Sequence, residues 1–299
     1  MIRIQSLGVR NSVSIEDTQD SEEISVTKPI IRIFWSYAHE NTETRDTLER
    51  YLGALKHLGQ IAMWHDQKIL PGTSWEEESQ QCLKDSDLFL CLVSDHFLNS
   101  HYRWNIEMRF AFEQWEEGRI TIVPILVNSV DYRGTLIDGF QVLPTEGKAI
   151  NCWSDYEKAY ADIAADIRKV IEMLLAKKWH QRGHAWYCLS QYDLALSAYE
   201  EAIRLDPSNP YFHCDKGEAL LKLKQYKEAI VAYDTAIKLK PDFGTAFQGK
   251  GLALEGFAPL AREHYKELAK QAFQKANDLD GGNKRKRNRS KKRQGGHQE

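Results

Sequence analysis

One carboxylate in this chain is placed where it could do chemistry. Glu107 belongs to the stretch LVSDHFLNSHYRWNIEM (92–108), in which an apolar run gives way to a polar loop and then to a helical pattern. Ser100 is a residue type that caps helix N-termini, so the pattern predicts that Glu107 lies two turns into that helix. A carboxylate held in a fixed place can stabilise positive charge that develops on a reacting substrate. The alternative is an ordinary glutamate on a helix surface.

Short strands and helices alternate around this stretch. Helical patterns occupy 42–58, the segment that begins near Trp75 and the segment after Ser154. Five strands separated by helices predict a parallel sheet with helices on both faces, in a flavodoxin-like α/β fold with the strand order 2-1-3-4-5. The five apolar runs that we interpret as strands are 31–35, 60–64, 88–93, 120–127 and 148–153.

This strand order places a ligand site next to Glu107. The order reverses between strands 1 and 3, and ligands of such sheets bind at the carboxyl ends of the strands there. In this chain those ends are SYAHE (36–40) and SDHFLNS (94–100). We therefore expect side chains from both loops, and from the helix that carries Glu107, to line one crevice.

The second half of the chain repeats itself with a period of 34 residues. Small residues recur so that paired helices can approach closely, and a proline closes the second helix of a pair. The pattern resembles tetratricopeptide (TPR) repeats, and we expect an all-α helical-repeat domain over 175–281. A third copy has about six extra residues and has Gly281 where a proline is expected. The aligned pairs are Gly183 with Gly217, Tyr192 with Tyr226, Ala195 with Ala229, Tyr199 with Tyr233, Ala202 with Ala236 and Pro207 with Pro241.

Three motifs in the first half resemble bacterial Toll/interleukin receptor (TIR) domains. They are IFWSYAHEN after strand 1, MWHDQKILPGTSW after strand 2 and LVSDHFLNSHYRWNIEMRFAFE after strand 3. Pro71-Gly72 in the second motif and Trp153 near strand 5 extend the resemblance over about 30–172. Many TIR domains of this type cleave NAD+ at the nicotinamide–ribose bond with a glutamate on the helix after strand 3. The resemblance implies that Glu107 is this catalytic residue.

The chemistry of NAD+ explains why one carboxylate can suffice. Glycosidases generally need a second carboxyl group to protonate the leaving oxygen. Nicotinamide carries a positive charge in NAD+ and leaves as a neutral molecule, so no acid is required. What remains is an oxocarbenium-like transition state, which Glu107 is expected to stabilise. Periodicity places Glu107 at the edge of an apolar helix face formed by Trp104, Met108, Ala111, Phe112 and Trp115.

Four further residues are candidates for contact with NAD+. Ser36 and Tyr37 follow strand 1, Asp66 lies on the loop after strand 2, and Trp104 could stack on a ring of the dinucleotide. Turn formation by Ser36 and Tyr37, and core packing by Trp104, are the alternatives. No CxxC pair, HExxH motif or Gly-rich phosphate loop occurs, so we expect no metal site and no cofactor, with NAD+ as the substrate.

Two functions are compatible with a TIR domain joined to TPR repeats. The resemblance implies an NAD+ glycohydrolase (NADase) that yields ADP-ribose or a cyclic isomer, in antiviral defence or cell suicide. The repeats would then bind a protein or peptide partner or promote assembly. The alternative is a non-catalytic signalling adaptor that acts only through protein–protein contacts. TIR domains occur in both classes, so the fold alone does not decide, and the carboxylate of Glu107 favours the enzyme.

The two ends of the chain differ in charge from the rest. Residues 1–28 have the composition of an acidic, disordered leader, and 282–299 that of a disordered tail. Within the tail, KRKRNRSKKR (284–293) carries eight positive charges, which favour weak contact with a polyanion. The five cysteines form no CxxC pair, and neither a membrane span nor a signal peptide is evident, so we expect a cytoplasmic chain without membrane contact.

Two expectations concern how the parts assemble. The TIR domain is expected over 29–174, and residues 155–182 contain no Gly or Pro, so its last helix should run into, or abut, the first TPR helix. The loop 65–75 carries Ile69 and Leu70 among polar residues, and we expect it to mediate self-association of TIR domains.

Overall fold

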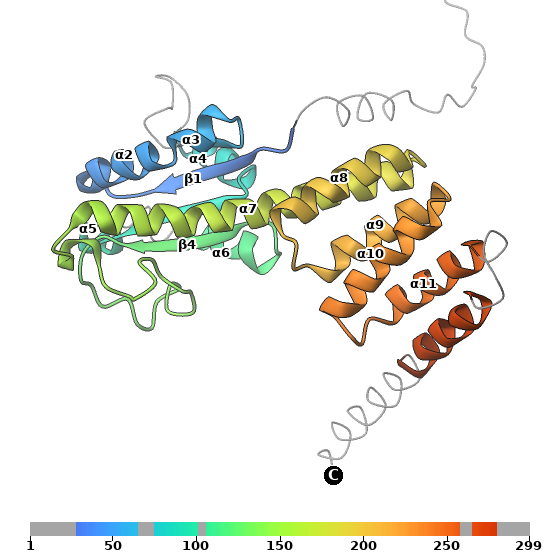
Figure 1. The fold of residues 1–299 in the computed structure, drawn as a ribbon. Coiled ribbons are helices and arrows are strands. Elements are labelled where there is room, and N and C mark those ends of the chain that lie inside the picture. The colour runs from blue at the N-terminus through green and yellow to red at the C-terminus, as the bar shows by residue number, and fades with distance from the viewer. Residues whose placement is uncertain (1–27, 65–74, 101–105, 258–264, 280–299) are drawn as a thin grey trace, which may run out of the picture.

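The computed structural model describes residues 28–64, 75–100, 106–257 and 265–279 (Figure 1). Predictions that fall on other residues lie outside this part of the chain. They include the acidic leader, the self-association loop, the basic tail, and the proposed roles of Asp66 and Trp104.

The first half contains a four-stranded parallel sheet in the order β2-β1-β3-β4. The order of these four strands confirms the prediction, including the reversal between β1 and β3. The strands are β1 (Ile31–Ser36), β2 (Ile61–Trp64), β3 (Leu88–Val93) and β4 (Thr121–Leu126). The connecting helices are η1 (His39–Asn41), α2 (Thr42–Tyr51), α3 (Gly53–His57), α4 (Trp75–Lys84), α5 (Asp95–Asn99) and α6 (Met108–Glu116).

The predicted fifth strand at 148–153 is wrong. Residues Ile150–Cys152 form a short 3-10 helix, η4, that leads into the next long helix. The position beside β4 is taken instead by Leu143, which forms a single parallel bridge with Ile125. Pro144 follows at once, and because proline has no N–H it cannot extend the ladder. Ala149 and Ile150 are therefore buried at the end of a loop rather than in the sheet, whereas Cys152 is exposed.

Both faces of the sheet are covered, and the strand period decides which residues face which side. Ile31, Ile33 and Trp35 of β1 belong to a core shared with α2 and the long helix α7 (Tyr156–Cys188). Phe34, between them, belongs to the opposite core, shared with α4, α5 and α6. Successive strand residues point to opposite faces, so Ser36 has the same parity as Phe34 and lies on the α6 side.

A continuous helix joins the two halves. α7 spans 33 residues and crosses the expected boundary near residue 175 without a break (Figure 1). The expectation that the last helix of the first half runs into the first repeat helix is thereby confirmed. Leu174 and Leu175 are buried in the core of the first half, whereas the adjacent Ala176 belongs to a core of the repeats.

Polar contacts brace this junction. The ammonium group of Lys178 donates to Oδ2 of Asp87 at 2.7 Å and to the carbonyl of Ile30 at 2.9 Å. Asp87 precedes β3 and also accepts a hydrogen bond from the backbone N–H of Arg32 at 2.8 Å. One lysine of α7 therefore contacts the amino ends of two sheet strands.

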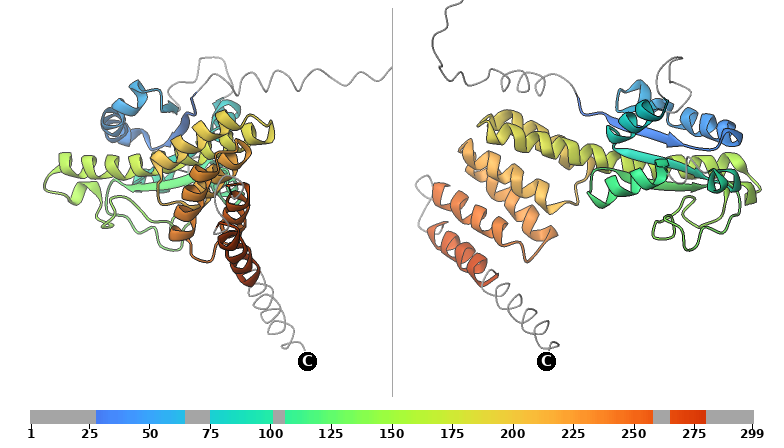
Figure 2. Two further views of the ribbon diagram at one scale, coloured as in Figure 1. Left: turned by 45° about the vertical axis from the view of Figure 1, so that its right-hand side comes forward. Right: turned by 180° about the vertical axis from the view of Figure 1, so that it is seen from behind.

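The remaining helices stack in antiparallel pairs beside the end of α7 (Figure 2). A further helix occupies residues 265–279. The pairs use glycine where a tyrosine ring of the facing helix lies against the backbone: a Cβ at Gly249 would lie 2.3 Å from Cζ of Tyr233. The helices are α8 (Tyr192–Leu205), α9 (Pro210–Lys222), α10 (Tyr226–Leu239) and α11 (Gly244–Phe257).

We expect Gly249→Ala to destabilise the repeat half by about 1–3 kcal/mol, as overpacking of a filled core does. Tyr233 is fully buried and cannot move aside without displacing its neighbours. The gain in helix propensity, about 1 kcal/mol, is smaller than this cost. Urea unfolding measures the change, and Gly53→Ala in α3 is the control because its Cβ would meet no atom within 4 Å. Equal stability of the two variants would contradict the packing argument.

Candidate functional site

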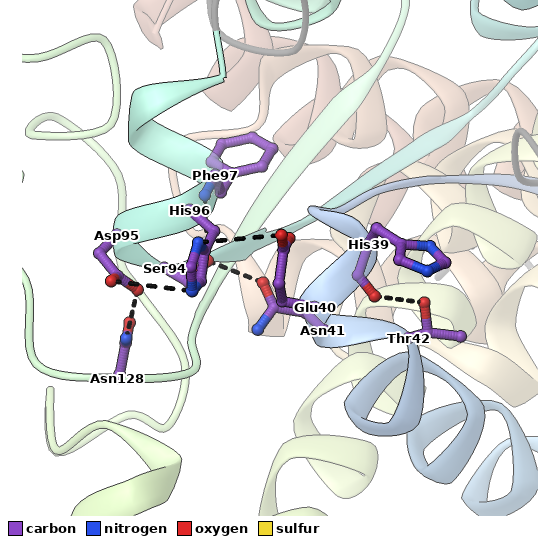
Figure 3. A network of polar contacts seen from close by, with 9 residues as sticks. All are labelled: His39, Glu40, Asn41, Thr42, Ser94, Asp95, His96, Phe97 and Asn128. Carbon is purple, nitrogen blue, oxygen red and sulfur yellow. Dashed lines mark hydrogen bonds and ion pairs between the residues drawn. The ribbon is translucent and has the colours of Figure 1, made fainter.

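The loops that follow β1 and β3 are tied together at the carboxyl edge of the sheet (Figure 3). The hydroxyl of Ser94 donates to Oδ1 of Asn41 at 2.7 Å, and both side chains are buried. The same hydroxyl accepts a hydrogen bond from the N–H of Phe97 at 3.1 Å, so Ser94 is the N-cap of α5. This serine therefore holds the two loops on either side of the switch point.

The loop after β4 joins the same network. The side-chain amide of Asn128 donates to Oδ1 of Asp95 at 2.6 Å, and this hydrogen bond is the main reason that the pKa of Asp95 is lowered. His96 lies 4.0 Å from the carboxylates of both Glu40 and Asp95 (Figure 3). Polar side chains from three loops thus meet at one edge.

Glu107 and Ser36 contact each other. The hydroxyl of Ser36 donates to Oε2 of Glu107, and the two side chains are 1% and 4% exposed. Ser36 is the last residue of β1, and its parity points it toward α6. Glu107 is the N-cap residue of α6 and lies directly before Met108. Two residues predicted separately are brought together, 71 positions apart in the chain.

The other predicted residues are placed differently. Tyr37 is buried, and Cζ of Arg45 lies 5.0 Å above its ring centroid, so the ring lies in the core on the α7 side of the sheet. Its contact with a ligand stays a prediction. Ser100 is the C-cap of α5, whereas residues 101–105, on which its predicted N-cap role depends, lie outside the described chain.

The apolar face of α6 is partly as expected. Met108 and Ala111 are fully buried, but Trp115 is 42% exposed and packs against Phe140 at a ring-centroid distance of 4.9 Å.

The sequence did not predict the hydrogen bond between Asn41 and Ser94. Its only signal was a serine directly after a strand and three residues before Phe97, which is the spacing of an N-cap.

Comparison with known proteins agrees with this arrangement. Residues 33–163 match the family model described as TIR domain, 183–224 match the model described as TPR repeat, and 210–243 match the model described as tetratricopeptide repeat. The chain contains a TIR domain followed by TPR repeats. The switch-point edge with Ser36 and Glu107 therefore belongs to the TIR domain, and the helices within 183–243 belong to the repeats.

Each of the similar proteins matches less than half of this chain. The uncharacterized protein y4lF of Sinorhizobium fredii is 32% identical over 137 residues, which span 46% of this chain and 42% of that protein. The TPR domain of Arabidopsis OM64 is 24% identical with a TM-score of 0.34, over 37% of this chain and 86% of that one. The second TPR domain of Spaghetti (RPAP3), solved with an HSP90 peptide, is 27% identical with a TM-score of 0.32, over 35% and 91%.

Within the residues that the structure describes, no helix combines the length and the apolar character that crossing a bilayer requires.

Proposed function

We propose that the TIR domain is an NAD+ glycohydrolase and that Glu107 is its catalytic carboxylate. The observation that carries the proposal is the contact between Glu107 and Ser36 at the carboxyl edge of the sheet, beside the reversal between β1 and β3. Open α/β sheets bind their ligands at this place. The membership of residues 33–163 in the TIR family supports the same reaction, because the family includes NADases.

The reaction needs little from the protein beyond a fixed negative charge. The bond between ribose C1′ and the nicotinamide nitrogen breaks, and its electron pair leaves with nicotinamide, which becomes neutral. Positive charge then develops on the ribose ring, where the carboxylate of Glu107 stabilises it. Water adds to C1′, loses a proton and gives ADP-ribose, or a nucleophile of the same molecule adds, loses its proton and gives a form of cyclic ADP-ribose.

Ser36 acts as a positioning residue in this proposal. Its hydroxyl donates to one carboxylate oxygen of Glu107, Oε2, and so fixes the orientation of the carboxylate. The backbone of Ser36 is fixed by β1, and the loops beside it are fixed by the hydrogen bond between Ser94 and Asn41. A carboxylate oriented in advance gives more stabilisation of a developing charge than one that must reorganise.

The adaptor is the second candidate function, and one observation favours it. Glu107 is 4% exposed and already hydrogen-bonded, so its contact with Ser36 also fits a purely structural role. In that case the TIR domain and the TPR repeats would act only through partner proteins. In either function, the repeats would bind a protein or peptide or bring TIR domains together.

Binding of NAD+ separates the two functions. Glu107→Gln keeps an oxygen that accepts from Ser36, so this variant should bind NAD+ without consuming it. Calorimetric titration of the full chain should then give saturable binding, with the exposed Glu113→Gln as the matched control on the same helix. Saturable binding supports the enzyme, and its absence at millimolar NAD+ supports the adaptor.

A further inference from the structure

Two facing helices of the repeats carry a mixed group of metal-binding side chains. Cys214, Asp215 and Glu218 lie on α9, and the thiol sulfur and one oxygen from each carboxylate lie within 4.8 Å of one another. On α7, Nε2 of His180 lies 2.5 Å from Oδ2 of Asp215. Thiol, carboxylate and imidazole are the ligand types that zinc and similar transition-metal ions take.

The spacing of these residues places those of each helix on one side of that helix. Cys214 and Glu218 are four residues apart, so they lie on one side of α9. His180 and His184 have the same spacing on α7, and Sγ of Cys188, one turn further, lies 3.6 Å from Nδ1 of His184. The helix that continues from the TIR domain therefore carries a row of possible ligands of its own.

A buried tyrosine on α10 packs against the helix that carries this group. Tyr233 on α10 is fully buried, and its hydroxyl has no hydrogen-bond partner among the described residues. The ring end lies against α9: a Cβ on Gly217, the residue before Glu218, would lie 2.9 Å from Cζ of Tyr233. The hydroxyl itself lies beside α11, where a Cβ on Gly249 would be 2.6 Å from it, and buried hydroxyls normally have a hydrogen-bond partner.

Burial and mutual repulsion disfavour the anionic forms of these side chains in the protein alone. Burial raises the pKa of Cys214 to about 12, and the charges of Asp215 and Glu218 add to this shift. Burial and the charge of Asp215 likewise raise the pKa of Glu218, against the smaller effects of Lys222 and His184. A divalent ion among the three groups would stabilise all of their anionic forms.

We propose that Cys214, Asp215 and Glu218, with His180 beside Asp215, form a binding site for a divalent transition-metal ion. Zn2+ suits this set of sulfur, oxygen and nitrogen donors best. An ion bound here would link α9 to α7, the helix that extends into the TIR domain. The site thus gives the repeats a metal-dependent contact that is independent of NAD+ cleavage.

Titration of the reduced, tag-free full chain with Co2+ tests the site directly. Co2+ bound to a thiolate gives a charge-transfer absorption, which should saturate at one equivalent and disappear when Zn2+ is added. Cys214→Ser should remove the absorption, and Glu218→Gln should weaken binding of Zn2+ by about tenfold or more. Glu218 is only partly buried, so the second variant keeps the test valid if Cys214→Ser fails to fold.

Two matched controls decide the outcome. Cys152→Ser removes an exposed thiol outside the group, and His213→Ala removes an α9 histidine that contacts the carbonyl of Pro207 instead. Both should bind Co2+ and Zn2+ as the unmodified chain does. The proposal is wrong if the thiolate absorption never appears, if it survives in Cys214→Ser, or if Glu218→Gln binds Zn2+ with unchanged affinity.

Discussion

Glu107→Gln is expected to lower the rate of nicotinamide release by a factor on the order of a hundred or more. Removing one main electrostatic contributor to a buried transition state typically has an effect of this size. Glutamine has nearly the same shape and still accepts the hydrogen bond from Ser36, so the loss would come from the charge rather than from the fold. The rate is measured by chromatography of nicotinamide under saturating NAD+.

The control for this variant lies on the same helix. Glu113 is exposed on α6, and Glu113→Gln should retain the rate of the unmodified chain. Circular dichroism and the unfolding midpoint should match in all three proteins. A Glu107→Gln protein that keeps a third of the original rate would rule out Glu107 as the catalytic carboxylate.

Insertion of Gly-Gly-Ser-Gly after Leu175 is expected to uncouple the two halves. The insertion breaks α7 between residues buried in the TIR core and residues buried in the repeats. Glycine is a poor helix former, and the contact of Lys178 with Asp87 depends on an unbroken α7. Cleavage between residues 172 and 180 by a non-specific protease should become about tenfold faster or more, since local opening controls such cleavage.

The same insertion should leave Glu107 and its contact with Ser36 in place, because neither is near the junction in the sequence. Thermal unfolding should then show two transitions where the unmodified chain shows one. Ready cleavage of the unmodified chain between 172 and 180 would mean that the halves are already independent. In that case α7 would not hold the TIR domain and the repeats in a fixed arrangement.

The sheet could be predicted because its strands are short apolar runs bounded by polar loops. β3 corresponds to LFLCLV, every residue of which is buried. The prediction of a fifth strand was wrong because KAINCW contains apolar residues but forms no ladder with β4. Pro144 ends the pairing beside β4 before this segment is reached, and hydrophobicity alone does not reveal which segment pairs.

The sequence identified individual residues of the candidate site, but it did not show which of them contact one another. Ser36 and Glu107 came from different motifs, and their hydrogen bond depends on strand parity and on how α6 packs across the sheet. The group at Cys214 was missed for a related reason. Its side chains have the spacing of ordinary repeat residues, and only the pairing of α7 with α9 brings His180 to Asp215. The expectation of no metal site relied on closely spaced motifs alone.

The most direct measurement is nicotinamide release from NAD+ by the concentrated, unmodified full chain, with the Glu107→Gln protein as the blank. The proposal predicts that nicotinamide accumulates with time, in equal amounts with ADP-ribose or its cyclic isomer, and that the blank stays near background. NAD+ that remains intact over a day in both samples, at protein concentrations up to those of the titration, would contradict the assignment of a glycohydrolase.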